Sequence, residues 1–531
     1  MIWKKNILNI ELVISWTLLL FMAIFMVSET FSDTMLLPKW YLSEVVIVIC
    51  GTIILITFIL NYKNNEYKNL FTILEIVVLS LCTLQATLML IQKTGVIKNY
   101  GEFTCGSFDN PAGFASCISF SWVLGLHGLR DQVKRKRFLL LLSKSICLLS
   151  IIMSGSRTGL ICIFLISLYL IFRKREKHRL LFFTLLITVF VFFTFIIKKD
   201  STSGRWFIYQ RTIELINKRP LLGWGSNGFE QQYMKIQGYY FEHHPIGEYT
   251  MLADGIKHPL NEYLNIAVNY GLLGVVLLVM VLFFIFRYYY RHPSKISEVG
   301  FCTLLSIILF SMFSYPFSYP FTWIMCFFSL YAIFHKDLVL MVSRVKYRRY
   351  LCAAFLLFFV LITPGLYSKI SNDIKWKRIS EYAKYGVSEK MMSRYDNIYL
   401  QMRNNPYFLY NYAAEEYAAG RYRDALVRAK ECQRFFLDYD LEMLTADCYQ
   451  SLNNIQMAIY HYHKAHYMIP SRLMPYYGEF DVYRQSNDIV NARKMAYLIL
   501  GLPVKVKSYS TKRIKDEVKL YVISEESSLN Q

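Results

Sequence analysis

Charged side chains are scarce in this chain of 531 residues, in which Asp, Glu, Lys and Arg together make up 18% of the composition. Soluble domains usually have about 25% charged residues, so the sequence is not that of one soluble globule. Glycine and proline are also sparse, at 24 and 13 residues, which excludes collagen-like, low-complexity and broadly disordered chains. Hydrophobic residues make up 55% of the chain and gather in residues 1–370. The composition indicates a membrane domain, residues 1–370, followed by a polar domain, residues 371–531.

The apolar runs in residues 1–370 predict an all-α, polytopic membrane fold with about eleven to twelve transmembrane helices. A helix that crosses the membrane needs about 20 mostly apolar residues. The first run has no small-residue cleavage site after it, so we interpret it as an anchor. The predicted spans are residues 8–28, 41–60, 70–91, 112–129, 138–153, 158–172, 180–197, 263–286, 298–314, 319–335 and 350–367.

Lys and Arg gather in alternate loops, most densely at residues 130–137 and 173–179. Short cytoplasmic loops carry such an excess, so the N-terminus is predicted to be cytoplasmic. A large loop at about 198–262 and the whole of residues 371–531 are then extracytoplasmic. Much of the net charge of +21 follows from this topology, and no nucleic-acid partner is predicted.

Residues 371–531 repeat with a period of about 33 to 34 residues. Ala425, Ala458 and Ala492 mark the same position in successive units, and their surroundings resemble the tetratricopeptide repeat. Stacked helix pairs of this kind share one core and leave a face for a protein partner. A generic helical bundle is the alternative. Cys432 and Cys448 fall on neighbouring helices, where we favour small packing side chains over a disulfide.

Three histidines in this tail, His461, His463 and His466, suggest a metal site. Residues two apart on a helix point to different faces, so at most His463 and His466 converge. We therefore favour a solvated histidine face, and we predict no metal ligands.

Two predicted turns at the extracytoplasmic ends of spans contain candidate site residues. In GSFDNPAGFA, Asn110 precedes Pro111 and is placed to cap a helix. In SGSRTG, Arg157 lies between two apolar helices with little room for a solvated loop. An arginine there is costly unless it meets an anion or a carboxylate; anchoring to lipid headgroups is the alternative.

The large loop supplies the remaining candidates. Its first part contains Arg205, Trp206 and Arg211, followed by the glycine-rich sequence RPLLGWGSNGF. We expect these glycines to allow tight turns and the close approach of an anionic or sugar ligand. The aromatic residues between 229 and 249 can stack on sugars or pack the loop.

Its last part, HPLNEYLNIAVNYGLLG, places His258, Asn261 and Glu262 just before the chain re-enters the membrane. A histidine titrates near neutral pH and can act as a base.

These motifs together resemble the O-antigen ligase and polymerase superfamily over about residues 100–290. Members take glycans from a polyprenyl pyrophosphate carrier on the outer side of the bacterial inner membrane. The family usually has its histidine directly before the Asn of the last motif, whereas this chain has Leu260 there and His258 two residues earlier. A local turn at Pro259 is expected to return the ring to the same place.

The resemblance implies an inverting transfer from an undecaprenyl-pyrophosphate-linked glycan to an acceptor hydroxyl, without a cofactor. His258, Arg205 and Arg157 are the implied catalytic residues. Because arginines can supply the charge that a metal would otherwise provide, metal independence is predicted. The implied substrate-binding residues are Arg211, Asn110, Asn261, Glu262 and Trp206.

The motifs leave the acceptor open among lipid A core, a growing polysaccharide and a protein. The corresponding activities are those of a ligase, a repeat-unit polymerase and a protein O-oligosaccharyltransferase. Two non-enzymatic alternatives are a flippase or transporter and a membrane scaffold. Glu75 and Lys144 lie within predicted spans, where they can pair or snorkel rather than form an ion path.

Overall fold

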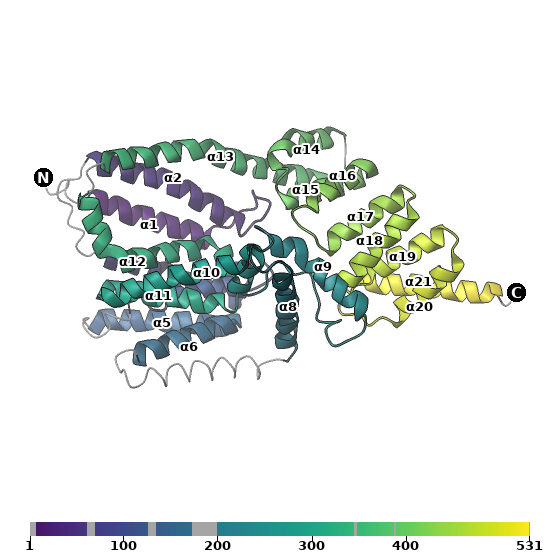
Figure 1. Ribbon diagram of the computed structural model, residues 1–531, viewed down its shortest axis with the longest axis horizontal. Coiled ribbons are helices and arrows are strands. Elements are labelled where there is room, and N and C mark those ends of the chain that lie inside the picture. The colour runs from purple at the N-terminus through teal and green to yellow at the C-terminus, as the bar shows by residue number, and fades with distance from the viewer. Residues whose placement is uncertain are drawn as a thin grey trace. The chain divides into compact units, whose positions relative to one another are not determined.

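The structure is a computed structural model that describes residues 7–60, 70–125, 134–172, 199–344, 348–386 and 389–529. All regular secondary structure in these residues is helical (Figure 1), which confirms the predicted all-α fold. The chain divides into two compact units. The first contains the described residues up to 172 together with Leu260–Glu262 and Leu277–Lys377. The second contains the described residues from 199 to 259, Tyr263–Val276 and the chain from Arg378 onward.

In the first unit, a helix coincides with each predicted span that falls on described residues. The predicted span at 180–197 lies outside the described residues. The helices are α1 (Ile7–Phe25), α2 (Leu37–Leu60), α3 (Leu70–Lys93), α4 (Pro111–Ser121), α5 (Lys134–Ser154), α6 (Arg157–Phe172), the C-terminal part of α10 (Glu262–Arg291), α11 (Lys295–Ser311), η4 (Pro316–Ser318), α12 (Pro320–Arg344) and α13 (Arg348–Ala383), the last of which ends in the second unit.

Several of these helices are suited to a bilayer, and the chain is a multi-pass membrane protein. Five described helices are long and apolar enough to cross a membrane: Leu37–Thr57, Leu70–Lys93, Arg135–Ser154, Glu262–Arg291 and Tyr350–Ala383. α4 has only 11 residues and rises about 16 Å, too little to cross alone. Residues 122–125 continue it as a turn.

Glu75 and Lys144, the charged residues within predicted spans, form hydrogen bonds with the backbone at the C-terminal end of α4. The Lys144 ammonium donates hydrogen bonds to the carbonyls of Ser121 and Trp122, at 3.0 and 2.7 Å. The Glu75 carboxylate accepts one from the amide of Gly125 at 2.5 Å. These side chains thus satisfy backbone groups that a helix end leaves unpaired, instead of snorkelling to the bilayer surface.

The second unit combines part of the large loop with the tail. Its helices are α8 (Lys199–Lys218), α9 (Gly228–His243), the N-terminal part of α10, α14 (Glu389–Met402), α15 (Pro406–Ala418), α16 (Tyr422–Cys432), α17 (Tyr439–Ser451), α18 (Ile455–Met468), α19 (Met474–Gln485), α20 (Ile489–Gly501) and α21 (Tyr509–Leu529).

The tail contains three successive helix pairs, α15 with α16, α17 with α18 and α19 with α20, and consecutive helices pack together (Figure 1). Ala425, Ala458 and Ala492 are each the fourth residue of the second helix in a pair, and all three are completely buried. A side chain this small lets the paired helices approach closely. The three alanines thus occupy equivalent positions in the three helix pairs, and the likeness to the tetratricopeptide repeat stays a prediction.

The turns inside the pairs repeat as well. Gly420, Asn453 and Asn487 all have a positive φ, at 76°, 58° and 58°. Glycine and asparagine adopt this left-handed conformation most readily. The same turn conformation therefore recurs in each helix pair, as the buried alanine does. Cys432 and Cys448 are free and buried.

The predicted solvated histidine face is wrong for two of its three members. His461 and His466 are only 7% and 8% exposed. Each contacts a buried glutamate of a neighbouring helix, Glu442 at 2.6 Å and Glu479 at 2.8 Å. Buried carboxylates that need partners explain why these histidines face inward.

Candidate active site

Asn110 is the N-cap of α4, as its position before Pro111 predicted. Its side-chain oxygen accepts a hydrogen bond from the amide of Gly113 at 2.8 Å, and its nitrogen donates one to the hydroxyl of Tyr319 at 2.7 Å. A Cβ at Gly113 would lie 2.4 Å from the Tyr319 ring. Tyr319 in turn donates to Asp109 at 2.8 Å. The motif therefore forms a packed polar cluster in which the Asn110 amide makes its hydrogen bonds to other groups of the protein.

Asn261 and Glu262 hold the start of α10 within the first unit. The Asn261 amide donates to the carbonyl of Met312 at 2.9 Å. The Glu262 carboxylate, in a residue that is 8% exposed, accepts from the amide of Phe317 at 3.2 Å. Both side chains therefore hold the backbone that follows His258 in the sequence, which suits residues that position the histidine.

Arg157 is the first residue of α6 and is half-buried. The preceding Ser156 accepts a hydrogen bond from the amide of Gly159 at 3.3 Å, and a Cβ at Gly159 would lie 2.9 Å from Ala115 of α4. The close approach of α4 and α6 at this point is therefore allowed by the glycine of SGSRTG. A guanidinium at the positive end of a helix concentrates positive charge, which favours an anionic ligand.

The second unit contains Arg205, Trp206 and Arg211, all on α8. The Arg211 guanidinium lies 4.4 Å from the centre of the Tyr240 ring and 3.1 Å from the Glu214 carboxylate. Its Nε is buried and makes no hydrogen bond within the described residues. Arg205 is half-buried, whereas Trp206 is 55% exposed. Arg211, implied as a substrate-binding residue, therefore has an aromatic ring packed against its guanidinium.

The glycine-rich part of the loop binds another segment of the same unit. Residues 220–225 and 268–272 run together through backbone hydrogen bonds, from Trp224 to Val268 and from Gly225 to Asn269, each 2.9 Å long. A third joins the amide of Leu272 to the carbonyl of Pro220 at 2.8 Å. Backbone hydrogen bonds thus join the RPLLGWGSNGF motif to the HPLNEYLNIAVNYGLLG motif.

Gly223 and Gly271 make this pairing possible. Their φ angles are +70° and +66°, and Gly271 kinks α10. A Cβ would lie 2.5 Å from the Val268 carbonyl oxygen at Gly223 and 2.1 Å from the Leu221 carbonyl oxygen at Gly271. The expectation that the glycines of RPLLGWGSNGF admit a ligand is corrected at Gly223, because the group that approaches there is protein backbone.

The aromatic residues of the loop mostly pack its own core. Phe229, Tyr233 and Phe241 are at most 1% exposed, and Tyr239 is 57% exposed. Phe207, Phe241 and Ala253 form a buried cluster with Tyr240 and Tyr249 at its edge. Among these residues, only the outer tyrosines remain placed for contact with a sugar.

His258 is half-buried in the loop before α10. Burial, reinforced by the charge of Lys257, lowers the pKa of His258 to about 4. The imidazole is therefore neutral at neutral pH and able to accept a proton. Two residues later Leu260 has a φ of +55°. Such a left-handed backbone is uncommon for a non-glycine residue and forms the sharp turn predicted at Pro259.

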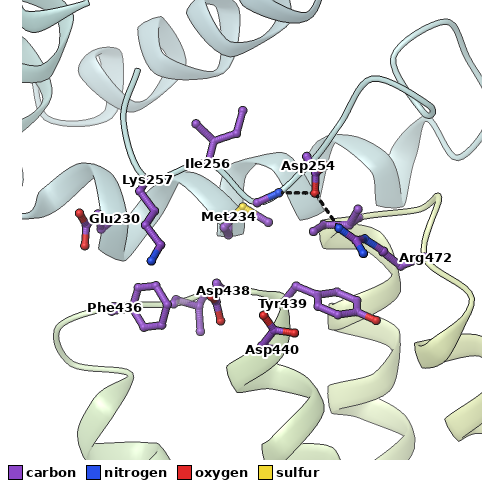
Figure 2. A pocket seen from close by; sticks show the side chains of 13 residues that line it. Glu230, Met234, Asp254, Ile256, Lys257, Phe436, Asp438, Tyr439, Asp440 and Arg472 are labelled. Atoms are coloured by element: carbon purple, nitrogen blue, oxygen red, sulfur yellow. Dashed lines mark hydrogen bonds and ion pairs between the residues drawn. The ribbon is translucent and has the colours of Figure 1, made fainter. Parts of the chain in front are cut away.

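A cavity of about 310 Å³ lies beside this loop within the second unit. Lys257 extends from the loop toward Phe436 and Asp438 on the opposite wall (Figure 2). Its ammonium lies 4.4 Å from the centre of the Tyr407 ring. On another side Asp254 pairs with Arg472 at 3.2 Å. The residue next to His258 is therefore part of the cavity wall.

Carboxylates outnumber cations in this cavity. Glu230, Asp254, Asp438 and Asp440 face Lys257 and Arg472. Burial raises the pKa of Asp438 to about 6 and also raises the pKa values of Glu230 and Asp440. Such acceptors favour a ligand that brings hydrogen-bond donors, for example hydroxyl groups.

Comparison with known families identifies the segment that contains most of these residues. Residues 142–279 match the O-antigen ligase family. This match confirms the resemblance seen in the motifs over residues 142–279 and supports ligase-like glycan transfer in general. No curated protein and no solved structure matches the chain.

The match defines which candidates belong to the ligase segment. Arg157, Arg205, Arg211, His258 and the pair formed by Asn261 and Glu262 fall inside residues 142–279, whereas Asn110 precedes them. The carboxylate-rich cavity draws its loop side from the ligase segment and its opposite side from the tail. Sequence reasoning missed this cavity, because nothing in residues 436–440 indicates that they meet the loop.

The chain contains a DxD sequence, Asp438-Tyr439-Asp440. Asp438 caps α17 by accepting a hydrogen bond from the amide of Leu441 at 3.0 Å, and both aspartates line the cavity. Within the described ranges, the group of His, Cys, Asp or Glu side chains that is close enough to share a metal ion consists of His463, His466 and Glu479. Asp438 and Asp440 are not part of it. Metal independence therefore stays a prediction that rests on the arginines.

Proposed function

We propose that this protein transfers a glycan from undecaprenyl pyrophosphate to an acceptor hydroxyl on the outer face of the bacterial inner membrane. The observation that carries the proposal is the ligase match, whose segment contains the candidate residues Arg157, Arg205 and Arg211 and the neutral His258. A transporter has no need for this combination. A scaffold would explain the repeats in the tail but not the arginines.

In the proposed reaction, the acceptor oxygen attacks the anomeric carbon of the first sugar. A new glycosidic bond forms while the bond from that carbon to the pyrophosphate oxygen breaks. His258 takes the proton of the acceptor hydroxyl, which its neutral imidazole can do at physiological pH. Attack opposite the leaving group inverts the anomeric configuration.

The departing pyrophosphate gathers negative charge in the transition state. Arg157, Arg205 and Arg211 are proposed to bind its phosphate oxygens, because a guanidinium stays charged and offers paired donors. The buried Nε of Arg211 has a donor available for this purpose. Stabilisation of this kind by fixed donors commonly contributes a few kcal/mol to catalysis, and no metal is required.

The other predicted site residues take supporting roles in this proposal. Asn261 and Glu262 hold the backbone that follows His258, and Asn110 holds the entrance of α4. Trp206 is exposed and offers a ring for a sugar of the donor. The carboxylates of the cavity beside Lys257 are proposed to accept hydrogen bonds from the acceptor, because Lys257, the residue before His258, lines the cavity.

A deletion strain complemented with variants tests this function. Native protein, Arg205→Ala, Arg211→Ala and His258→Ala are compared by blots that separate carrier-linked, lipid A-linked and protein-linked glycan. Lys218→Gln serves as the matched control on α8, because it removes an exposed cation that has no role in the proposed reaction. We expect each alanine variant to lose transfer at normal protein abundance.

The material that accumulates identifies the acceptor. Full-length glycan left on its carrier indicates a ligase or, where protein-linked material disappears, a protein O-oligosaccharyltransferase. Single repeat units on the usual acceptor indicate a polymerase. If all three alanine variants restore the native pattern, the proposed chemistry is wrong and a scaffold or transporter replaces it.

A further inference from the structure

Three side chains at the junction of α18 and α19 converge outside the ligase segment. His463 and His466 lie one turn apart on α18, and Glu479 lies on α19. One ligating atom from each falls within 4.8 Å of the other two. The His463 Nε2 is 2.8 Å from one Glu479 oxygen, and the His466 Nδ1 is 2.8 Å from the other.

The Glu479 carboxylate is not fully satisfied by this arrangement. The residue is completely buried, yet its Oε2 accepts no hydrogen bond within the described residues. The His463 Nε2 lies 2.8 Å from this oxygen, and an ion pair forms there only when the ring is protonated. A buried carboxylate without compensation is costly, and a cation held between the two atoms would supply that compensation.

A neighbouring glutamate shows how the same fold neutralises a buried carboxylate with its own cation. Glu442 of α17 is also completely buried. It pairs with His461 at 2.6 Å and with the ammonium of Lys464 at 2.8 Å, both on α18. The partners of Glu479 among the described residues are histidines, which carry no permanent charge.

We propose that His463, His466 and Glu479 form a binding site for one zinc ion. Two imidazoles and a carboxylate are a common ligand set for zinc, which leaves a fourth position for water. The site differs from the proposed transfer site and does not depend on the proposed function. Its role is to join α18 to α19 within the helix pairs of the tail.

The surroundings suit this site. The His466 ring stacks on Tyr476, with ring centres 4.6 Å apart, which fixes its orientation. The His463 side chain is 45% exposed, so an ion can reach the site and the ring can move. Zinc at about 2.1 Å from each atom places tetrahedral ligands roughly 3.4 Å apart, so the two N···O distances of 2.8 Å must lengthen by about 0.6 Å. Binding replaces ring protons and releases them.

Zinc titration of the full-length protein in detergent tests the site. The protein is stripped with a chelator and titrated with zinc chloride by calorimetry, and bound metal is measured by elemental analysis. His463→Ala removes a half-exposed ligand, and Glu479→Gln removes the carboxylate charge. His243→Ala is the control, because it removes an exposed histidine of α9.

We expect one equivalent of zinc on the native protein and on His243→Ala, with affinity at least tenfold weaker in the other two variants. Zinc should raise the unfolding temperature of the native protein but not that of His463→Ala. Circular dichroism checks the fold, and if Glu479→Gln unfolds, His463→Ala decides. Equal binding by native protein and His463→Ala overturns the proposal, as does a native protein that binds no zinc.

Discussion

At the scale of single residues, the environment of His258 sets the pH at which transfer should work. The pKa of His258 is lowered to about 4 by burial and by Lys257, so the base is available above that pH. Activity should therefore fall as the pH drops through about 4, where the imidazole becomes protonated.

Lys257→Gln should move this acidic limit to higher pH. Removal of the neighbouring cation favours the charged imidazole and raises the pKa of His258. The pH profile of transfer by the purified protein measures the shift, and Lys235→Gln on α9 is the control. An unchanged or lowered limit would show that His258 is not the base.

Glu416 gives a second prediction, which concerns stability. Burial raises the pKa of Glu416 to about 7 despite the opposing charge of Arg428, from an ordinary value of 4.5. Between these values the folded protein keeps a proton that the unfolded chain releases, so stability falls as the pH rises through this window.

Glu416→Gln should remove this dependence and stabilise the tail at pH 8 more than at pH 5. Denaturant unfolding at both pH values measures the difference. The exposed Glu389→Gln serves as the control. A variant whose relative stability is the same at both pH values would contradict the raised pKa.

At the scale of elements, the pairing of residues 220–225 with 268–272 should depend on its glycines. Gly271→Ala places a Cβ 2.1 Å from a carbonyl oxygen at a positive φ. Strain of this kind costs on the order of 1–3 kcal/mol, and the overlap adds to it. We expect lower abundance and loss of transfer.

Gly247→Ala is the matched control, because a Cβ there meets nothing within 4 Å and its φ is not positive. Abundance on membranes and limited proteolysis of the loop measure both variants. Native-like protease resistance in Gly271→Ala would show that the backbone pairing is dispensable.

The sequence predicted elements better than it predicted their partners. Apolar run length gives helix positions directly, and the small residues Ala425, Ala458 and Ala492 give the repeat, because both signals are local. The partner of Gly223 lies 45 residues away at Val268, and no local signal identifies it. For the same reason the histidines of α18 were assigned to solvent, since their buried glutamates lie on other helices.

Local contacts of the candidate residues could be predicted from the sequence, but contacts between distant segments could not. Asn110 was expected to cap a helix, and it does. The aromatic support of Arg211 and the carboxylate cavity beside Lys257 arise from segments far apart in the chain. Such contacts depend on how the helices fold back on one another, which residue spacing does not determine.

At the scale of the whole molecule, the loop and the tail are predicted to lie on the same, extracytoplasmic side of the membrane. The distribution of Lys and Arg among the loops requires this. A reporter that is active only outside the cytoplasm should be active when fused after Gly247 or after Gly386, and inactive when fused at the N-terminus. Activity of the N-terminal fusion would invert the topology and remove the donor from the proposed site.

The central claim is that this chain catalyses glycan transfer from undecaprenyl pyrophosphate. The most direct measurement is the release of undecaprenyl pyrophosphate by purified full-length protein in vesicles that contain carrier-linked glycan and acceptor. We predict acceptor-dependent release by the native protein and a loss of about 100-fold or more in His258→Ala, because a positioned base contributes roughly 10²–10⁴-fold. Release by His258→Ala at the native rate, or no release by native protein supplied with donor and acceptor, would contradict the account.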